Sequence, residues 1–211
     1  MGVPGTSPAA ALLGEAHEGP PYELGGDSAL RAYGHPLWVS PNLSDTKETP
    51  MKRFRDRSLR LPYYDYSQGS FFITIVCKKM IPFFGEIRHG SLYLNDAGNR
   101  IEKLWQNLPD HFSGLSLGPH VLMPNHFHAV LSLDPIRSYT TLGTIIGTFK
   151  SQSTHRYIQG VKQYNWKPFP GKLWQENYYE HIIRNEADHM RIEKYIANNP
   201  LKWELDRFYC P

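Results

Sequence analysis

Two histidines separated by one residue, His126 and His128, are the side chains of this sequence best suited to holding a metal. Alternate residues of a β-strand point to the same face, so the two imidazoles would project side by side from a strand. A strand is favoured because apolar residues alternate with them: Phe127, Ala129, Leu131 and Leu133. Imidazole is a favoured ligand of divalent metals. Such a pair can also be purely structural, so it becomes specific only with a third ligand and a reactive group.

A tyrosine and an asparagine near the C-terminus offer that reactive group and that ligand. The stretch from about Glu186 is predicted to be a helix, with one stripe formed by Asp188, Ile192, Tyr195 and Asn199. Pro200 lacks a backbone N–H and disfavours a helical conformation at the residue before it, so the helix should end at Asn199. The phenol of Tyr195 and the amide of Asn199 would then be neighbours. The structural alternative is a half-buried aromatic beside a helix stop.

Seven short blocks of sequence can be compared with known families: Arg57–Leu61, Tyr64–Tyr66, Phe71–Thr74, Met123–His128, Gly147–Ser151, Leu173–Asn185 and Tyr195–Pro200. Together, and in this order, they resemble the REP-associated tyrosine transposases. These are HUH-type, single-tyrosine relatives of the transposases that move insertion sequences as single strands. One departure concerns the metal, because the insertion-sequence relatives carry glutamine four residues after the tyrosine, where this chain has Asn199.

The resemblance implies a ferredoxin-like HUH domain with the histidine strand in the centre of the sheet. It implies that Tyr195 is the catalytic nucleophile and that His126, His128 and Asn199 hold the metal. Mixed nitrogen and oxygen ligands suit several divalent ions, Zn²⁺ and Ni²⁺ included, and the resemblance favours Mg²⁺ or Mn²⁺. The implied partner is single-stranded DNA with hairpins formed by palindromic repeats. The insertion-sequence relatives are dimers, so a homodimer is one expectation, although the hydrophobic periodicity says nothing about oligomeric state.

Four further side chains are candidates for contacts with DNA. Lys150 and Arg184 could hold phosphates, since lysine is a point-charge donor and arginine a fork. Tyr178 and Tyr179 could stack on unpaired bases, and they are also rival nucleophiles. Neither has an amide partner and a helix stop beside it, as Tyr195 does. For Lys150, solvation at the surface is an equally good explanation.

The composition is that of a globular protein without a membrane span. The chain has 211 residues, of which 40% are hydrophobic, and no apolar run approaches the roughly 20 residues that a span needs. Cys77 and Cys210 lack the spacing of a metal site or a disulfide framework. These features predict a cytoplasmic protein, associated with the nucleoid if DNA is its partner. The net charge of +3 is too small to argue for nucleic acid alone, but the acidic first fifty residues leave the remainder more basic.

The hydrophobic patterns predict an α+β domain over residues 51–211, with helices packed on an antiparallel sheet. Residues 1–50 are rich in Gly, Pro, Ala and Ser without a sustained period, which predicts a disordered extension. Met51 is a candidate for the natural start. Strands are expected at Ser70–Cys77, Tyr93–Leu94, Leu115–Met123 and the histidine segment, and helices after Asn95 or Asp96, from Leu142 to about Ile158 and near the C-terminus. Gln159–Leu173 is expected to be a loop containing one short hairpin.

These residues predict a metal-dependent tyrosine transposase: a single-stranded DNA endonuclease and strand transferase that acts on hairpin repeats through a 5′-phosphotyrosine. A divalent ion on a non-bridging oxygen would neutralise charge that gathers in the transition state. Two other classes stay open. A catalytically silent DNA-binding regulator is disfavoured by the presence of the complete set of candidate residues. A metallohydrolase of small substrates fits poorly with the aromatic and basic C-terminal half.

Overall fold

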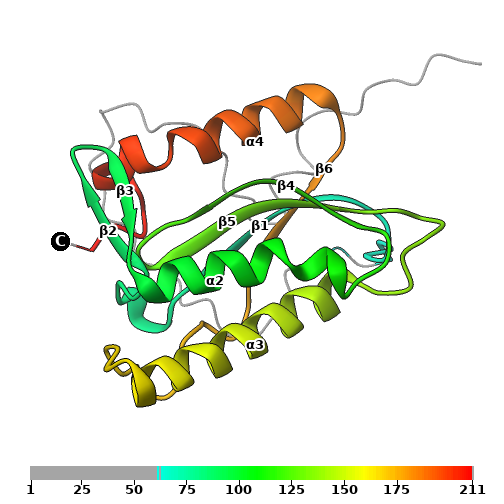
Figure 1. Ribbon diagram of the computed structural model, residues 1–211. Coiled ribbons are helices and arrows are strands. Elements are labelled where there is room, and N and C mark those ends of the chain that lie inside the picture. Colours follow the sequence, from blue (N-terminus) through cyan, green and yellow to red (C-terminus); the bar gives the residue numbers. More distant parts are fainter. Residues whose placement is uncertain (1–60, 62, 211) are drawn as a thin grey trace, which may run out of the picture. The chain divides into compact units, whose positions relative to one another are not determined.

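The computed structural model describes residue 61 and residues 63–210, all of which belong to one unit spanning Phe54–Pro211. The predicted extension at residues 1–50, and with it the question of Met51, lies outside the described residues. The strands are β1 (Gly69–Val76), β2 (Gly85–Arg88), β3 (Ser91–Leu94), β4 (Leu115–Leu122), β5 (His126–Leu133) and β6 (Tyr179–Ile183) (Figure 1). The helices are α2 (Asp96–Gln106), α3 (Leu142–Gln163) and α4 (Glu186–Asn198), with short 3₁₀ turns at Lys78–Met80, Leu108–Asp110 and Pro200–Leu205.

Four strands form an antiparallel sheet in the order β4-β5-β1-β6. With α2 and α3 between them, the chain order is strand, helix, strand, strand, helix, strand, which is the ferredoxin-like arrangement. The strands β2 and β3 form a separate two-stranded sheet. The predicted α+β class, the antiparallel sheet with helices packed on it and the central position of the histidine strand are therefore confirmed.

The two faces of β5 have different neighbours, as its alternating sequence predicts. Phe127, Ala129, Leu131 and Leu133 belong to the main apolar core. That core lies under α2 and α3, which cover one face of the sheet (Figure 1). Trp105 of α2 and Phe149 of α3 both contact Phe127 edge-on or tilted, at ring-centroid distances of 4.9 and 5.4 Å. His126 and His128 consequently point to the opposite face.

The helix α4 covers that opposite face (Figure 1). It begins after Asn185, whose side chain accepts a hydrogen bond from the backbone N–H of Asp188. It ends with Asn199 as its C-terminal cap, and Pro200 then starts the 3₁₀ turn Pro200–Leu205. Ile192 is buried, so the stripe predicted for this helix does face the sheet. The boundaries predicted from Glu186 and Pro200 are confirmed.

Three predictions about elements need correction. The strands β2 and β6 were not expected, because short edge strands carry little periodicity of their own. The helix α3 runs five residues beyond Ile158 and ends at Gln163, since Tyr157 and Gly160 are buried and continue its core-facing stripe. The segment between Gln163 and Leu173 forms no hairpin. Within the described part of the chain, no helix combines the length and the apolar character that crossing a membrane requires.

Candidate active site

The side chains of His126 and His128 lie together and are completely buried. Both have 0% exposure, and their ring centroids are 4.6 Å apart. Across the sheet, His128 pairs with Thr74 of β1 and with Val121 of β4. Burial lowers the pKa of His126 to about 3 and holds that of His128 well below its usual value, helped by the charge of Arg207 on both. Both imidazoles are therefore neutral at physiological pH, which is the form that binds metals.

Asn125 determines which nitrogen of His126 carries the proton. Its Nδ2 donates to the backbone oxygens of Met80 and Phe208, both at 2.8 Å, so its Oδ1 must be the atom that faces the histidine. His126 Nδ1 lies 2.9 Å from that oxygen and is therefore the donor. The lone pair is then on Nε2, which is buried and has no hydrogen-bond partner. A neutral imidazole held this way by a neighbouring group is the arrangement typical of a metal ligand.

His128 is held in an equivalent way and faces the predicted nucleophile. Its Nδ1 lies 2.8 Å from the hydroxyl of Thr74, and that oxygen can accept a hydrogen bond from the Nδ1–H. Its Nε2 lies 3.2 Å from the phenol oxygen of Tyr195. The Tyr195 ring packs edge-on against both His128 and Phe72. The structure thus brings Tyr195 of α4 and the histidines of β5 together, although 67 residues separate Tyr195 from His128.

The surroundings of Tyr195 keep its phenol protonated. Burial is the main reason that the pKa of this group is raised, and the negative charge of Asp206 raises it further. The positive charge of Arg207 and a hydrogen bond with Asn199 act in the opposite direction. A phenol in this environment needs added positive charge beside it before it can act as a nucleophile.

Asn199, the third predicted ligand, is buried in the same region. Its side chain is 3% exposed, its Nδ2 donates to Asp206 Oδ2 at 3.3 Å, and its Oδ1 has no hydrogen-bond partner. Its amide influences the pKa values of both His126 and Tyr195. The sequence-based placement of Asn199 beside Tyr195 and the histidines therefore agrees with the geometry. Whether these residues bind a metal or act on DNA stays a prediction.

Two residues that influence this cluster were missed from the sequence, Asp206 and the exposed Arg207. Asp206 Oδ2 lies 3.9 Å from His126 Nε2. The Arg207 guanidinium packs 4.4 Å over the ring of Phe208, and its charge acts on the pKa of His126, His128, Tyr195 and Asp206. The sequence offers only a weak signal for them, an acidic and a basic residue shortly after the helix stop at Pro200.

The predicted DNA-binding residues are distributed over different parts of the unit. Tyr179 pairs with Thr74, which pairs with His128, so Tyr179 is on the same face of the sheet as the histidines. Tyr178 packs against the main core on the other face. Arg184 is exposed just after β6. Lys150, on α3, donates to the backbone oxygens of Gln175 and Glu176 at 2.7 and 2.6 Å, and burial lowers its pKa to about 8.

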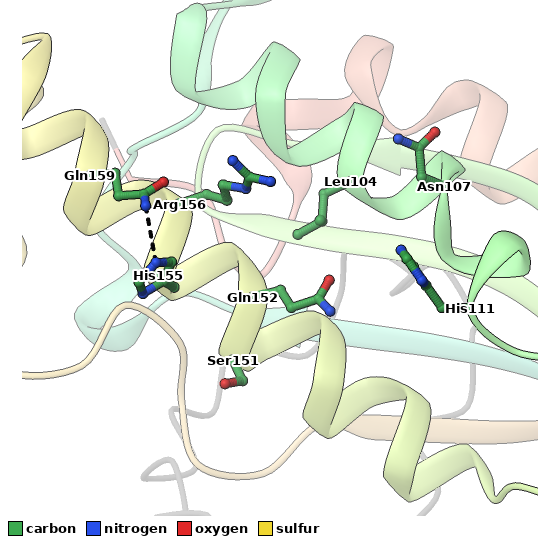
Figure 2. A pocket seen from close by; sticks show the side chains of 8 residues that line it. All are labelled: Leu104, Asn107, His111, Ser151, Gln152, His155, Arg156 and Gln159. Atoms are coloured by element: carbon green, nitrogen blue, oxygen red, sulfur yellow. Dashed lines mark hydrogen bonds between the residues drawn. The ribbon is translucent and has the colours of Figure 1, made fainter.

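A groove lies away from these residues, between α2 and α3. Its volume is about 650 Å³, and it is lined by Leu104, Asn107, His111, Ser151, Gln152, His155, Arg156 and Gln159. Figure 2 shows Arg156 extending from α3 toward α2, with Asn107 and His111 across from α3. None of the predicted site residues lines it. The candidate nucleophile and the candidate metal ligands are thus confined to the α4 side of the sheet.

Comparison with known proteins identifies the family. The family described as "Transposase IS200 like" matches residues 87–199, which include both histidines, Tyr195 and Asn199. The chain belongs to the IS200-like transposase family. An uncharacterized protein of Haemophilus influenzae is 35% identical to it over 173 residues, which cover 72% of this chain and 92% of that protein.

The chain is also similar to proteins described as REP-associated tyrosine transposases. A second Haemophilus influenzae protein, described provisionally as a REP-associated tyrosine transposase, is 25% identical over 142 residues, which cover 65% of this transposase and 74% of that protein. Among solved structures, a REP-associated tyrosine transposase bound to a REP hairpin is 19% identical with a TM-score of 0.49, and the match covers 68% of this chain and 73% of the other. A provisional transposase from Deinococcus radiodurans is 18% identical with a TM-score of 0.42, over 66% of this chain and 95% of the other.

Proposed function

We propose that this transposase is a metal-dependent single-stranded DNA endonuclease and strand transferase that acts on hairpin repeats. The observation that carries the proposal is the position of the Tyr195 phenol oxygen, 3.2 Å from His128 Nε2 and close to the buried side chains of His126 and Asn199. A hydroxyl nucleophile beside groups able to hold a metal suits attack on a phosphodiester. A DNA substrate would place the protein at the chromosome.

His126, His128 and Asn199 would hold the metal, because His126 Nε2 and Asn199 Oδ1 are buried acceptors without partners. Nitrogen and oxygen ligands together suit a divalent ion, and the sequence resemblance favours Mn²⁺ or Mg²⁺. When bound, the ion would withdraw negative charge from a non-bridging phosphate oxygen. The neutral state of both imidazoles, which burial maintains, keeps their lone pairs available for this role.

In the reaction, the phenol oxygen of Tyr195 attacks the phosphorus and loses its proton. The bond from phosphorus to the 3′-oxygen of the neighbouring nucleotide breaks, and that oxygen leaves as a 3′-hydroxyl after taking up a proton. The product is a 5′-phosphotyrosine, whose phosphodiester bond stores the energy of the broken one. Attack by another 3′-hydroxyl reverses the step and joins a new strand, so no ATP is needed. Arg207, whose charge lowers the pKa of the phenol, favours the ionised tyrosine oxygen in both directions.

The DNA contacts are proposed on weaker support. Arg184 and Lys150 are candidates for binding DNA phosphates. Tyr179 is a candidate for stacking on an unpaired base close to Tyr195, since it shares the sheet face of His128. Tyr178, which packs against the core, is the least accessible of the four. Hairpin repeats are proposed as the substrate because of the sequence resemblance and the similarity to a relative described as REP-associated.

The test is cleavage of a 5′-labelled single strand carrying a hairpin, with the full chain and Mn²⁺. We expect cleavage with the native protein, none in EDTA, and a reduction of at least about a hundredfold for His128→Ala, since the change removes a candidate metal ligand. His155→Ala, an exposed histidine of α3, is the matched control and should cleave normally.

Binding of the hairpin without cleavage in Mn²⁺ or Mg²⁺ would instead support the alternative, a catalytically silent DNA-binding regulator. If His128→Ala cleaved the DNA as fast as the native protein, the proposed role of the histidines as metal ligands would be wrong.

A further inference from the structure

The segment that follows α4 crosses directly over His126. The rings of Trp203 and Phe208 stack or tilt against its imidazole at centroid distances of 5.9 and 4.8 Å. Asn125 holds the segment by donating to the backbone oxygen of Phe208, and the segment turns internally where the N–H of Asp206 donates to Trp203 O at 3.0 Å. Asp206, between the two aromatic residues, is thereby placed beside His126.

The carboxylate of Asp206 is buried next to the candidate metal ligands. Its side chain is 6% exposed, and Oδ2 lies 3.9 Å from His126 Nε2 and 3.3 Å from Asn199 Nδ2. The other oxygen, Oδ1, accepts from the backbone N–H of Phe208 at 2.7 Å. Burying a carboxylate is costly unless a cation compensates it. Across residues 61 and 63–210, no lysine or arginine forms an ion pair with Asp206.

Two buried acceptors beside this carboxylate also lack hydrogen-bond partners. They are His126 Nε2 and Asn199 Oδ1, both of which are suited to ligate a cation. The ligand atoms of His126, His128 and Asp206 all lie within 4.8 Å of one another. Ligands about 2.1 Å from one shared ion are separated by about 3 to 4 Å, so small side-chain movements would suffice to bring these atoms around it.

We propose that Asp206 is a direct ligand of the metal, contributed by the C-terminal segment alongside His126, His128 and Asn199. This inference rests on the proposed function, since it concerns the metal that His126, His128 and Asn199 are proposed to hold. A carboxylate oxygen is a harder ligand than imidazole, so Asp206 shifts the preference of the site toward Mn²⁺ and Mg²⁺. Ligation by Asp206 would also stabilise the position of Trp203 and Phe208 against His126.

The first test measures binding of Mn²⁺ alone to the full chain, by titration calorimetry without DNA. Asp206→Asn keeps the shape of the side chain and an oxygen for the Phe208 N–H, but removes the charge. We expect its Mn²⁺ affinity to fall at least about tenfold. Glu204→Gln, a carboxylate two residues away and exposed to solvent, is the matched control and should bind within twofold of the native protein. Equal Mn²⁺ affinity of Asp206→Asn and the native protein would overturn the proposal.

The second test measures amide hydrogen exchange with and without Mn²⁺, and it remains informative if Asp206→Asn is less stable than the native protein. Mn²⁺ should slow exchange of peptides covering Trp203 to Tyr209 in the native protein and in Glu204→Gln, but not in Asp206→Asn. Protection by Mn²⁺ that persists in Asp206→Asn would count against ligation by Asp206. The two proposals can be distinguished. If Mn²⁺ binding depends on Asp206 but no DNA is cleaved, only the proposed function is wrong. If DNA is cleaved but Mn²⁺ binding does not depend on Asp206, only the proposed ligand is wrong.

Discussion

The two histidines are most informative for the state in which they are held. Asn125 fixes the proton of His126 on Nδ1, and the Thr74 hydroxyl occupies Nδ1 of His128. With Nδ1 engaged in each ring, His128 Nε2 faces the Tyr195 hydroxyl, and His126 Nε2 has no hydrogen-bond partner. A histidine buried only for packing would have both nitrogens satisfied or remote from other reactive groups. The arrangement of these two rings therefore supports the proposal that they ligate a cation.

Their neutral state makes stability depend on pH. The pKa of His126 is depressed in the folded protein, so its contribution to stability is fully present above the ordinary pKa of 6.5 and is lost as the pH falls toward about 3. Between pH 7.5 and pH 5 we expect His126 to account for a loss of about 2 kcal/mol in the metal-free protein. Urea unfolding at the two pH values measures it, with His126→Gln as the comparison. An equal pH dependence of the two proteins would show that His126 is not the cause.

The residues of the site divide into those that the sequence reveals and those that it does not. Tyr195 and Asn199 were predictable because helical spacing and Pro200 place them on one face of one turn. Asp206 and Arg207 were not, since they follow the helix in irregular backbone whose path depends on Asn125, some eighty residues earlier. A contact made through one distant hydrogen bond leaves no periodic pattern in the sequence.

At the scale of elements, β5 is the framework of the site. Its alternation of apolar and histidine side chains predicts correctly that one face joins the core and that the other carries the two histidines. The path of α4 across that second face was not predictable, because its apolar stripe fits any hydrophobic surface. The short edge strand β6 was missed for a related reason, as its pairing with β1 is set by the sheet rather than by its own sequence.

Asn125 connects three of these elements, and its removal should affect both stability and the site. It has 0% exposure and bonds to Met80 O, Phe208 O and His126 Nδ1. Asn125→Ala leaves those groups without partners, so we expect a loss of at least about 2 kcal/mol in the free energy of unfolding. Mn²⁺ affinity should fall about ten- to a hundredfold, because His126 loses the group that orients it.

The matched control is Asn99→Ala, which removes an exposed asparagine of α2 with one long hydrogen bond to Leu94 O. Urea unfolding and Mn²⁺ titration of both variants give the comparison. If Asn125→Ala behaved like Asn99→Ala in both measurements, the proposed link between Asn125 and the metal site would be wrong.

At the scale of the whole unit, the two faces of the sheet differ in character. The α4 face holds the candidate nucleophile beside the two histidines, and Trp203 and Phe208 pack against His126 there. The opposite face presents α3, whose 22 residues include Lys150, Arg156 and Lys162 but no aspartate or glutamate. A phosphate in a rigid duplex could not readily reach a half-buried tyrosine, whereas a flexible single strand could.

This difference predicts a preference among DNA forms. A single strand carrying a hairpin should bind at least about tenfold more tightly than the same sequence in a perfect duplex, when both are measured at one stated salt concentration. Fluorescence anisotropy with the full chain, in EDTA to prevent cleavage, provides the measurement. Equal or tighter binding of the duplex would contradict the proposed substrate.

The most direct test of the central claim is to locate the covalent bond between protein and DNA. The full chain is incubated with hairpin-bearing single strands and Mn²⁺, the adduct is digested, and the modified peptide is identified by mass spectrometry. We predict that the DNA is attached to Tyr195, that Tyr195→Phe forms neither adduct nor cleaved product, and that Tyr179→Phe, changed on the same face of the sheet, still forms the adduct. DNA attached to Tyr178 or Tyr179, or an active Tyr195→Phe protein, would contradict the assignment.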